Sequence, residues 1–330
     1  MLMLAGLMGL LMVGLAVDFT GGVKPDEDGH DEAEGAVQND AQTAEPSLDG
    51  NPLGEAIVGS DGGEILAGGE NADDIAGLGG DDQIGGYAGD DTLVGGAGAD
   101  AVRGDAGDDV IAGDAGNDTL MGGEGADTLS GGAGDDMLAG WEGDDVLSGG
   151  EGADSLVGGG GTDALIGGAG DDALEGGPGD DTLVGGLGQD TLMGGAGHDV
   201  LNGAERELDG TDTDQHDFLN GGAGNDTITA GQGDWANGGT GADSFLLHDW
   251  LSAGSGPATI EDYTAAEDQL VILYDPAIHP VPDVTVEPDP EDDKAVRVMI
   301  DGVVIARVLG DPDLTADQIE LVAEDEVHAA

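Results

Sequence analysis

From Gly68 to Asn202 the chain can be cut into fifteen consecutive blocks of nine residues, and this repeat limits the possible folds more than any other feature. The block GYAGDDTLV (86–94) is representative. The sixth position is Asp in every block, and the eighth is always Ile, Leu or Val. A low-complexity Gly-Asp linker gives no reason for a fixed aliphatic position, so we interpret the period as structural.

Each part of the block has a physical role. Glycine at positions one, two and four permits the positive φ angles that tight turns need. Positions seven to nine alternate, as in Thr92-Leu93-Val94, which predicts a strand of about three residues with only its middle side chain pointing inward. Stacked at about 4.8 Å, such strands form a continuous aliphatic column. Two blocks therefore predict one flat coil of an all-β solenoid with parallel strands.

Coiling aligns the sixth-position Asp residues in two columns. One column contains Asp73, Asp91, Asp109, Asp127, Asp145, Asp163, Asp181 and Asp199, and the other contains Asp82, Asp100, Asp118, Asp136, Asp154, Asp172 and Asp190. Seven blocks add a second Asp at position five, such as Asp90. Carboxylates stacked at strand spacing repel one another strongly. We therefore expect the array not to fold without cations in its turns.

The composition indicates which cation to expect. The chain has 72 Asp and Glu against 6 Lys and Arg, a net charge of -66, which excludes nucleic-acid binding because phosphates need basic partners. It has no Cys, which excludes a disulfide-stapled fold. The repeat offers hard oxygen ligands, with His198 the only imidazole in it, and this favours calcium. One ion in each gap between stacked turns gives about 13 core Ca²⁺ sites.

These blocks resemble the RTX family of haemolysin-type calcium-binding repeats, whose consensus is G-G-x-G-x-D-x-U-x. The resemblance implies a right-handed parallel β-roll in which each Ca²⁺ lies between a turn and the turn two blocks later. Asp side chains of both turns and backbone carbonyls would coordinate it. The family resemblance also implies export of the unfolded chain by a type I secretion apparatus, with folding in millimolar external calcium. Family members have many roles, so the repeat specifies the ligand and not the role.

Some blocks depart from the pattern. Residues 59–67 carry Glu64 where Asp is expected, which favours an atypical first turn or cap. Residues 203–220 lose the glycines, and Asp217 returns in register after a loop. Residues 221–229 are regular at Asp226, so Asp217 and Asp226 complete the predicted metal ligands. Asp234 and Asp243 are weaker candidates, because they lie in the less regular blocks that end the roll.

The composition divides the chain into four parts. Residues 1–17 are wholly apolar, and a helix of this length is about 26 Å long against a hydrocarbon core of about 30 Å. They lack preceding Lys or Arg and an A-x-A cleavage site, so they make a poor secretory signal. We favour a membrane-contacting or signal-anchor segment over a buried apolar helix or a mis-assigned start. Residues 18–55 predict an acidic disordered linker. The roll is expected over 56–245, followed by a β-rich C-terminal cap over 246–330.

Strands are expected in this C-terminal region at 258–263 and 269–274, with a hairpin of 296–300 and 303–308 around Asp301-Gly302. Residues 313–320 predict a short helical turn. We expect this region to cover the open end of the roll. The family resemblance suggests that it also carries an uncleaved secretion signal.

Catalytic motifs are missing from the sequence. It contains no H-E-x-x-H, no G-x-S-x-G and no Cys, and a carboxylate repeated in every block indicates a ligand ladder. We therefore expect no enzyme but a secreted, extracellular or cell-surface-associated calcium-binding protein with a structural or interaction role. Two alternatives remain open: a non-catalytic part of, or a small C-terminal enzyme attached to, a secreted glycan- or surface-active protein, and a membrane-tethered calcium buffer using residues 1–17.

Overall fold

The computed structural model describes residues 54, 56–204, 216–248, 256–277 and 279–323. All of them belong to one compact unit, Ala41–Ala330. The segment predicted at 1–17 and almost all of the linker predicted at 18–55 lie outside the described residues. Within the described ranges, no helix is long and apolar enough to cross a membrane.

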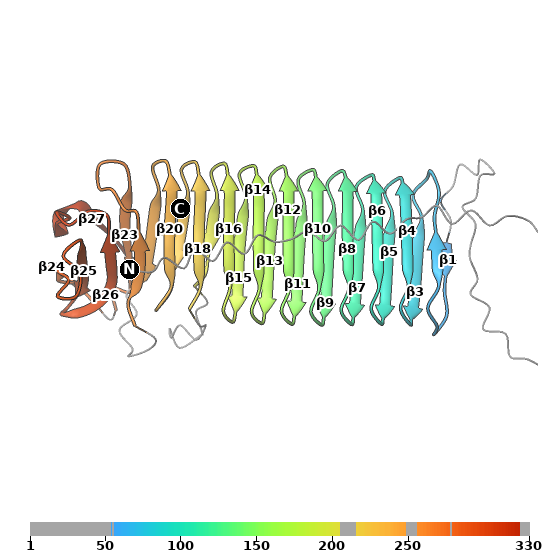
Figure 1. Cartoon of the computed structure of the whole chain (residues 1–330), viewed down its shortest axis with the longest axis horizontal. Coiled ribbons are helices and arrows are strands. Elements are labelled where there is room, and N and C mark those ends of the chain that lie inside the picture. The colour runs from blue at the N-terminus through green and yellow to red at the C-terminus, as the bar shows by residue number, and fades with distance from the viewer. Residues whose placement is uncertain (1–53, 55, 205–215, 249–255, 278, 324–330) are drawn as a thin grey trace, which may run out of the picture. The chain divides into compact units, whose positions relative to one another are not determined.

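The strands of the described ranges form two sheets, and successive strands of the repeat region fall alternately into one sheet and the other (Figure 1). The first sheet consists, in spatial order, of β1 (Ala56–Val58), β3 (Asp74–Gly79), β5 (Thr92–Ala97), β7 (Val110–Ala115), β9 (Thr128–Ala133), β11 (Val146–Glu151), β13 (Ala164–Ala169), β15 (Thr182–Leu187), β17 (Val200–Asn202), β19 (Thr227–Ala230), β21 (Ser244–His248), β23 (Gln269–Tyr274) and β27 (Ile319–Ala323).

The second sheet consists, in spatial order, of β2 (Ile65–Ala67), β4 (Gln83–Ala88), β6 (Ala101–Ala106), β8 (Thr119–Glu124), β10 (Met137–Glu142), β12 (Ser155–Gly160), β14 (Ala173–Pro178), β16 (Thr191–Ala196), β18 (Phe218–Ala223), β20 (Trp235–Thr240), β22 (Ala258–Glu261), β26 (Val303–Leu309), β25 (Ala295–Ile300) and β24 (Val284–Pro288).

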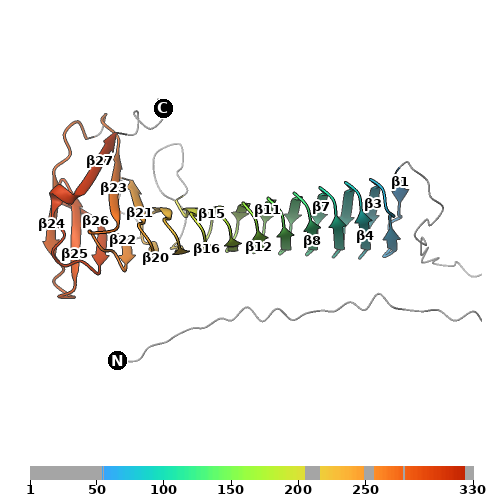
Figure 2. The same ribbon diagram turned by 90° about the horizontal axis from the view of Figure 1, so that it is seen from above.

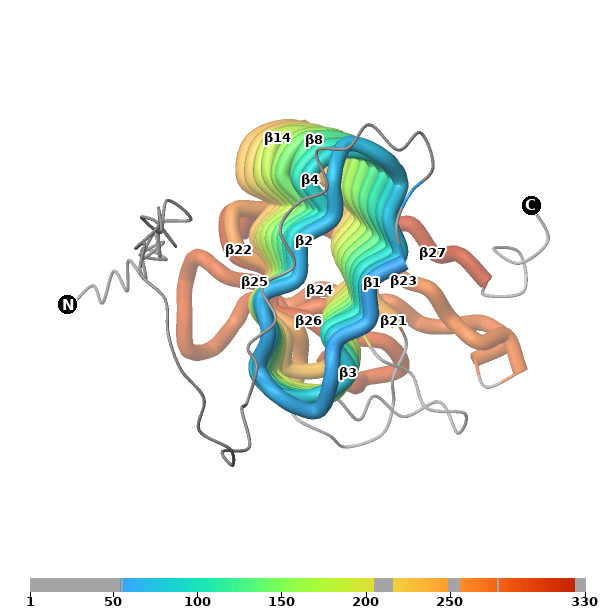
Figure 3. The backbone as a smooth tube through the Cα atoms, turned by 90° about the vertical axis from the view of Figure 1, so that its right-hand side faces the viewer, coloured from blue at the N-terminus to red at the C-terminus, as the bar shows by residue number. Residues whose placement is uncertain are grey.

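Strand pairing in the repeat region is parallel and joins residues one coil apart. Leu93 pairs with Ile111, and Leu138 pairs with Leu156, a step of two blocks in each case. Seen along the roll, successive coils therefore superpose, with the two sheets facing each other (Figure 3). The eighth-position side chains form one buried column between the sheets, with Leu93 and Leu147 at 0% exposure. The predicted parallel β-roll is confirmed.

The strands are twice as long as predicted. A typical strand such as β11 covers six residues, from position seven of one block to position three of the next, and the pairing Glu151↔Ala169 extends to its last residue. Only positions four to six remain for the turn. The first-position glycines are extended and buried, and they therefore serve packing, whereas the positive φ angles fall at positions two and four. The prediction that all three glycines serve the turn was therefore wrong for position one.

The insertion after β17 leaves the strand pairing of both sheets in register. Leu192 pairs with Leu219 although they are 27 residues apart, so nine extra residues leave the pairing intact, and residues 205–215 lie outside the described residues. Beyond the insertion the step shortens to 17 residues, as in Leu219↔Ala236. The aliphatic column tolerates this change because only the turns differ in length.

The C-terminal strands continue the two sheets beyond the repeats (Figure 2). As predicted, β22 and β23 form, and they pair in parallel with β20 and β21. The predicted hairpin also forms, with Asp301 and Gly302 both at positive φ between antiparallel β25 and β26. Two strands were not predicted: β24, which pairs with β25, and β27, which pairs with β23. The predicted helical turn is limited to the 3-10 turn η1 (Ala316–Gln318).

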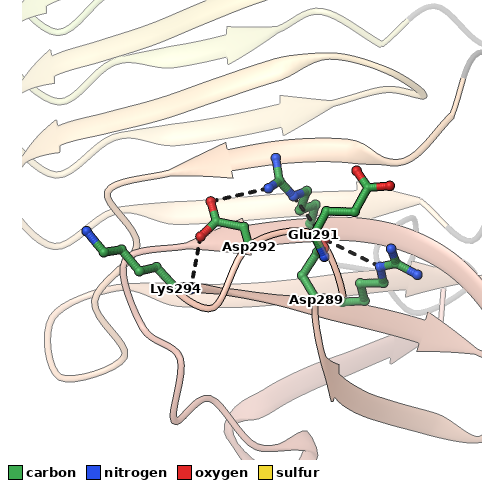
Figure 4. A network of polar contacts seen from close by, with 6 residues as sticks. Asp289, Glu291, Asp292 and Lys294 are labelled. Carbon is green, nitrogen blue, oxygen red and sulfur yellow. Dashed lines mark hydrogen bonds and ion pairs between the residues drawn. The ribbon is translucent and has the colours of Figure 1, made fainter. Parts of the chain in front are cut away.

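A polar network fixes the loop after β24 (Figure 4). Asp289 is 3% exposed in its side chain and accepts from Arg307 Nε at 3.0 Å and from Arg297 Nε at 3.4 Å. Its Oδ1 also accepts the N–H of Glu291 at 2.7 Å. Arg307 further contacts Asp292 at 3.4 Å. Three of the six basic side chains of the chain, at 294, 297 and 307, therefore belong to this C-terminal sheet end.

Candidate metal centre

The seventeen predicted ligands all lie in the interior of the roll. Each Asp stands directly before a strand and two residues before the buried aliphatic side chain, so alternation along the strand directs it inward. Their exposed fractions are only 1–3%. Each block therefore directs three residues inward, the Asp, the aliphatic residue and the following glycine, where the sequence predicted only one. The predicted ligand role of these residues remains a prediction.

From Asp82 onward, one oxygen of each sixth-position carboxylate connects adjacent coils. The backbone N–H of Asp73 donates to Oδ1 of Asp91 at 2.7 Å, and the N–H of Asp91 donates to Oδ1 of Asp109 at 2.8 Å. The same bond crosses the insertion, where the Asp190 N–H donates to Oδ1 of Asp217 at 2.7 Å. These bonds establish the two predicted Asp columns. They also use half of each carboxylate, which the sequence did not reveal.

The other oxygen is buried without a partner in most of the array. In every sixth-position Asp from Asp82 to Asp199, and in Asp226, Oδ2 has no hydrogen-bond partner among the described residues. A buried carboxylate oxygen without a donor is costly, because the desolvation of a charged group is not compensated. This row of oxygens is therefore the part of the fold that needs a bound cation or a proton.

The first-position glycines create the space beside Oδ2. A Cβ on Gly176 would lie 2.5 Å from Asp181 Oδ2 and 2.7 Å from the carbonyl oxygen of Gly194, one coil later. The same pair of oxygens surrounds the corresponding point at Gly149, where Asp154 Oδ2 and the Gly167 carbonyl approach. A carboxylate oxygen and a backbone carbonyl thus converge where only a glycine hydrogen intervenes. These hard oxygen donors fit a calcium ion.

Burial raises the pKa of these carboxyl groups. Desolvation, with a further contribution from neighbouring carboxylates, raises the pKa of Asp109 and Asp172 to about 7. The same causes raise the pKa of Asp145 and Asp136 to about 6, and the inter-coil N–H bond opposes the shift in each case. The negative form is therefore disfavoured in the roll unless positive charge lies beside it.

The fifth-position residues form a second, exposed ladder that runs in the opposite direction. The N–H of Thr162 donates to Oδ1 of Asp144 in the preceding coil at 2.8 Å, and the N–H of His198 donates to Oδ1 of Asp180 at 2.8 Å. His198 continues this ladder, because its Nδ1 accepts the N–H of Asn225 at 2.9 Å. These side chains face solvent, which distinguishes them from their buried sixth-position neighbours.

Three further Asp residues extend the columns. Asp234 accepts the N–H of Asp217 at 3.0 Å, and Asp243 accepts the N–H of Asp226 at 2.9 Å. Asp268 then accepts the N–H of Asp243 at 3.1 Å, although it lies in the predicted cap. Its sequence signal is the Asp placed two residues before a buried Leu270. The changed spacing along the chain hides this signal from a period of nine.

No group of three or more His, Cys, Asp or Glu side chains converges in the part of the chain that the structure describes. A calcium ion in these turns would therefore take many of its ligands from backbone carbonyls. The model of the RTX calcium-binding nonapeptide repeat matches residues 58–93, 85–120, 112–147, 121–156, 140–174, 175–205 and 211–245, more than half of the chain. The chain belongs to the RTX family. Among the curated proteins, none matches it.

Membership of the RTX family gives the roll its ligand, since RTX repeats bind calcium. The donor set agrees with this assignment, because the buried Oδ2 atoms and the glycine carbonyls beside them are hard oxygens. In the RTX roll, Asp residues of the two columns would hold the ions together with these carbonyls. Bound Ca²⁺ supplies the positive charge that the buried carboxylates otherwise lack.

Proposed function

We propose that this RTX protein is exported and folds outside the cell as calcium binds, and that it has a structural or interaction role there without catalysis. The observation that carries the proposal is the row of buried Oδ2 atoms without partners from Asp82 to Asp199. Above about pH 7, where the buried carboxyl groups are ionised, a fold that contains such a row is stable only where divalent cations are abundant. Folding and calcium binding are then the same event.

The calcium concentration at which the sites fill indicates whether the protein acts inside or outside the cell. Extracellular calcium-binding modules bind with dissociation constants of about 10⁻⁴–10⁻³ M, whereas intracellular sensors and buffers bind far more tightly. Asp91 and Asp127, the column neighbours of Asp109, repel its carboxylate, and bringing such carboxylates together consumes part of the free energy of calcium binding. A weak but cooperative array suits millimolar calcium. We propose about 13 core sites and export by a type I apparatus, with a secreted or cell-surface location.

A non-catalytic role accords with the surroundings of the titratable groups. Each buried Asp is one of a repeated series, and repetition suits a ligand ladder better than a single reaction centre. His279 is the only buried imidazole among the described residues, and its Nδ1 lies 2.6 Å from Oδ2 of Asp301 in the hairpin turn. This pair connects the 275–283 loop to the hairpin, which supports a structural role for it.

A calcium titration of the full chain, followed by circular dichroism, tests the proposed function. We expect the β signal to appear cooperatively with a midpoint between about 0.1 and 1 mM Ca²⁺. Mg²⁺ should be far less effective, because it demands octahedral geometry and loses its water reluctantly. A midpoint below about 1 μM would indicate folding at intracellular calcium and would contradict the proposed location.

Adjacent residues provide a matched pair of variants for this titration. Asp145→Asn alters a buried sixth-position carboxylate, whereas Asp144→Asn alters its exposed fifth-position neighbour. Asp145→Asn should shift the midpoint to several-fold higher calcium, and Asp144→Asn should shift it much less. Equal shifts for both variants would show that the buried column is not the binding element.

A further inference from the structure

The four carboxylates at the ends of the described columns differ from those between them. The column of the second sheet begins at Glu64 and ends at Asp234, and the column of the first sheet has Asp73 as its first Asp and ends at Asp268. In each of these four residues, the side-chain oxygen that lacks a partner from Asp82 to Asp199 and in Asp226 accepts a hydrogen bond from its own turn.

At the N-terminal end of each column, the carboxylate accepts a hydrogen bond from the residue four positions earlier, and we call such an end closed. The Gly69 N–H donates to Oδ2 of Asp73 at 2.7 Å. Glu64 replaces Asp, and its longer side chain folds back so that Oε2 accepts the Ser60 N–H at 3.1 Å and Oε1 accepts the Ser60 hydroxyl. The Glu64 N–H still donates to Oδ1 of Asp82 at 2.7 Å, so the column itself is intact.

The C-terminal ends are closed in the same manner. The Gly231 N–H donates to Oδ2 of Asp234 at 2.5 Å, and the Thr264 N–H donates to Oδ2 of Asp268 at 2.7 Å. The next residue along the second-sheet column is the buried Ala258, which follows Asp234 in register and carries no carboxylate. The chain thus supplies N–H donors where the ladder stops.

Closure coincides with irregular sequence. The four end turns read GSDGGE (59–64), GGENAD (68–73), AGQGD (230–234) and YTAAED (263–268), and each departs from the regular G-G-x-G-x-D. In the regular turns between them, Oδ2 is buried without a partner at Asp91, Asp145 and Asp190 alike. At the four irregular end turns, the chain itself therefore supplies a hydrogen-bond donor to the carboxylate oxygen that is left without a partner in the regular turns.

We propose that Glu64, Asp73, Asp234 and Asp268 bind no calcium ion of their own and delimit the array, which is confined to the turns between them. The proposal rests on the proposed calcium binding of the interior turns. A carboxylate oxygen that already accepts an N–H gains less from a cation, because the hydrogen bond already offsets part of its desolvation. The ends of the folded roll then remain closed even in saturating calcium.

Native mass spectrometry of the full chain in calcium tests this, because each bound ion appears as a separate mass step. Asp73→Asn and Asp268→Asn should retain the wild-type maximum number of ions. Asp91→Asn, one coil from Asp73 in the same column, should bind at least one ion fewer. Glu64→Asp shortens the side chain so that it no longer reaches Ser60, and it should bind one ion more than the wild-type chain.

The outcomes separate the two proposals. Loss of as many ions in Asp73→Asn and Asp268→Asn as in Asp91→Asn would overturn the closure of the ends while leaving calcium binding intact. A wild-type chain without any bound calcium would instead refute the proposed function. If Asp91→Asn does not fold, the ion numbers of Asp73→Asn and Asp268→Asn against the wild-type chain still decide the question.

Discussion

At the scale of single residues, the glycine at position one and the Asp five residues later form one packing unit. The glycine has no Cβ, and the carboxylate oxygen and a carbonyl of the next coil occupy the region where a Cβ would project. The glycine is therefore required by the site itself and not by the turn. This role is invisible in the sequence, where all glycines of the block look equivalent.

Gly176→Ala should destabilise the calcium-loaded roll by about 1–3 kcal/mol, because the new methyl group overlaps Asp181 Oδ2 and the Gly194 carbonyl. Thermal unfolding in saturating calcium measures the change. Gly85→Ala is the matched control, since its Cβ would lie no closer than 3.7 Å to its nearest neighbour, the Tyr87 ring. Equal destabilisation by the two substitutions would contradict the packing role assigned to position one.

At the scale of elements, the C-terminal hairpin depends on charge pairing in addition to apolar burial. Asp289 lies between Arg297 of β25 and Arg307 of β26, which face each other across the hairpin. The N–H of Glu291 and these two guanidinium groups lower the pKa of Asp289. One carboxylate thus fixes both the loop after β24 and the two strands that follow.

Asp289→Asn should lower the melting temperature of the C-terminal strands, because two guanidinium groups lose their shared anionic partner. Hydrogen exchange of β24 to β26 in saturating calcium localises the effect. Asp293→Asn, an exposed change four residues later, should leave exchange unaltered. Unchanged protection in Asp289→Asn would contradict the role of the network.

The repeat explains how much of the architecture was predictable. Because each block contributes the same inward residues, the period alone predicted the solenoid, the aliphatic column and the two Asp columns. Strand length was wrong because glycines usually interrupt strands, whereas here Gly149 and Gly150 continue one. The strand β24 follows Pro282 and ends at Pro288, which indicates a loop, and only its pairing with β25 makes it a strand. Asp268 was missed because its coil is longer than its predecessors.

At the scale of the whole molecule, negative charge is the main determinant of folding stability. The net charge of -66 is distributed over a chain whose interior also contains acidic groups. Two agents can neutralise the interior carboxylates, calcium ions and protons. The raised pKa values of the columns indicate that the calcium-free roll gains stability from protons at higher pH than an unfolded chain would.

Acid should partly replace calcium. The carboxyl groups of Asp109 and Asp172 have a pKa of about 7 in the folded roll, against 3.8 for an unperturbed Asp. The calcium-free folded form thus binds more protons than the unfolded form between these values, so stability falls as pH rises through this window. Stability from these groups is complete below about pH 4 and is lost above about pH 7.

Circular dichroism in calcium-free buffer should show more β structure at pH 5 than at pH 8. In saturating calcium, the two spectra should be alike. Light scattering checks that the acidic sample does not aggregate near its isoelectric point of about 4.1. A β signal that is larger at pH 8 than at pH 5 without calcium would show that buried carboxylates do not govern folding.

The inter-coil bonds have an evolutionary consequence. In regular coils every such bond joins a residue to its counterpart eighteen positions away, and none distinguishes one coil from the next. An in-frame duplication or deletion of eighteen codons within these coils would therefore recreate the inter-coil hydrogen bonds without any compensating substitution. Gene rearrangement can therefore lengthen or shorten the roll by whole coils, provided that the end turns of its two columns are retained.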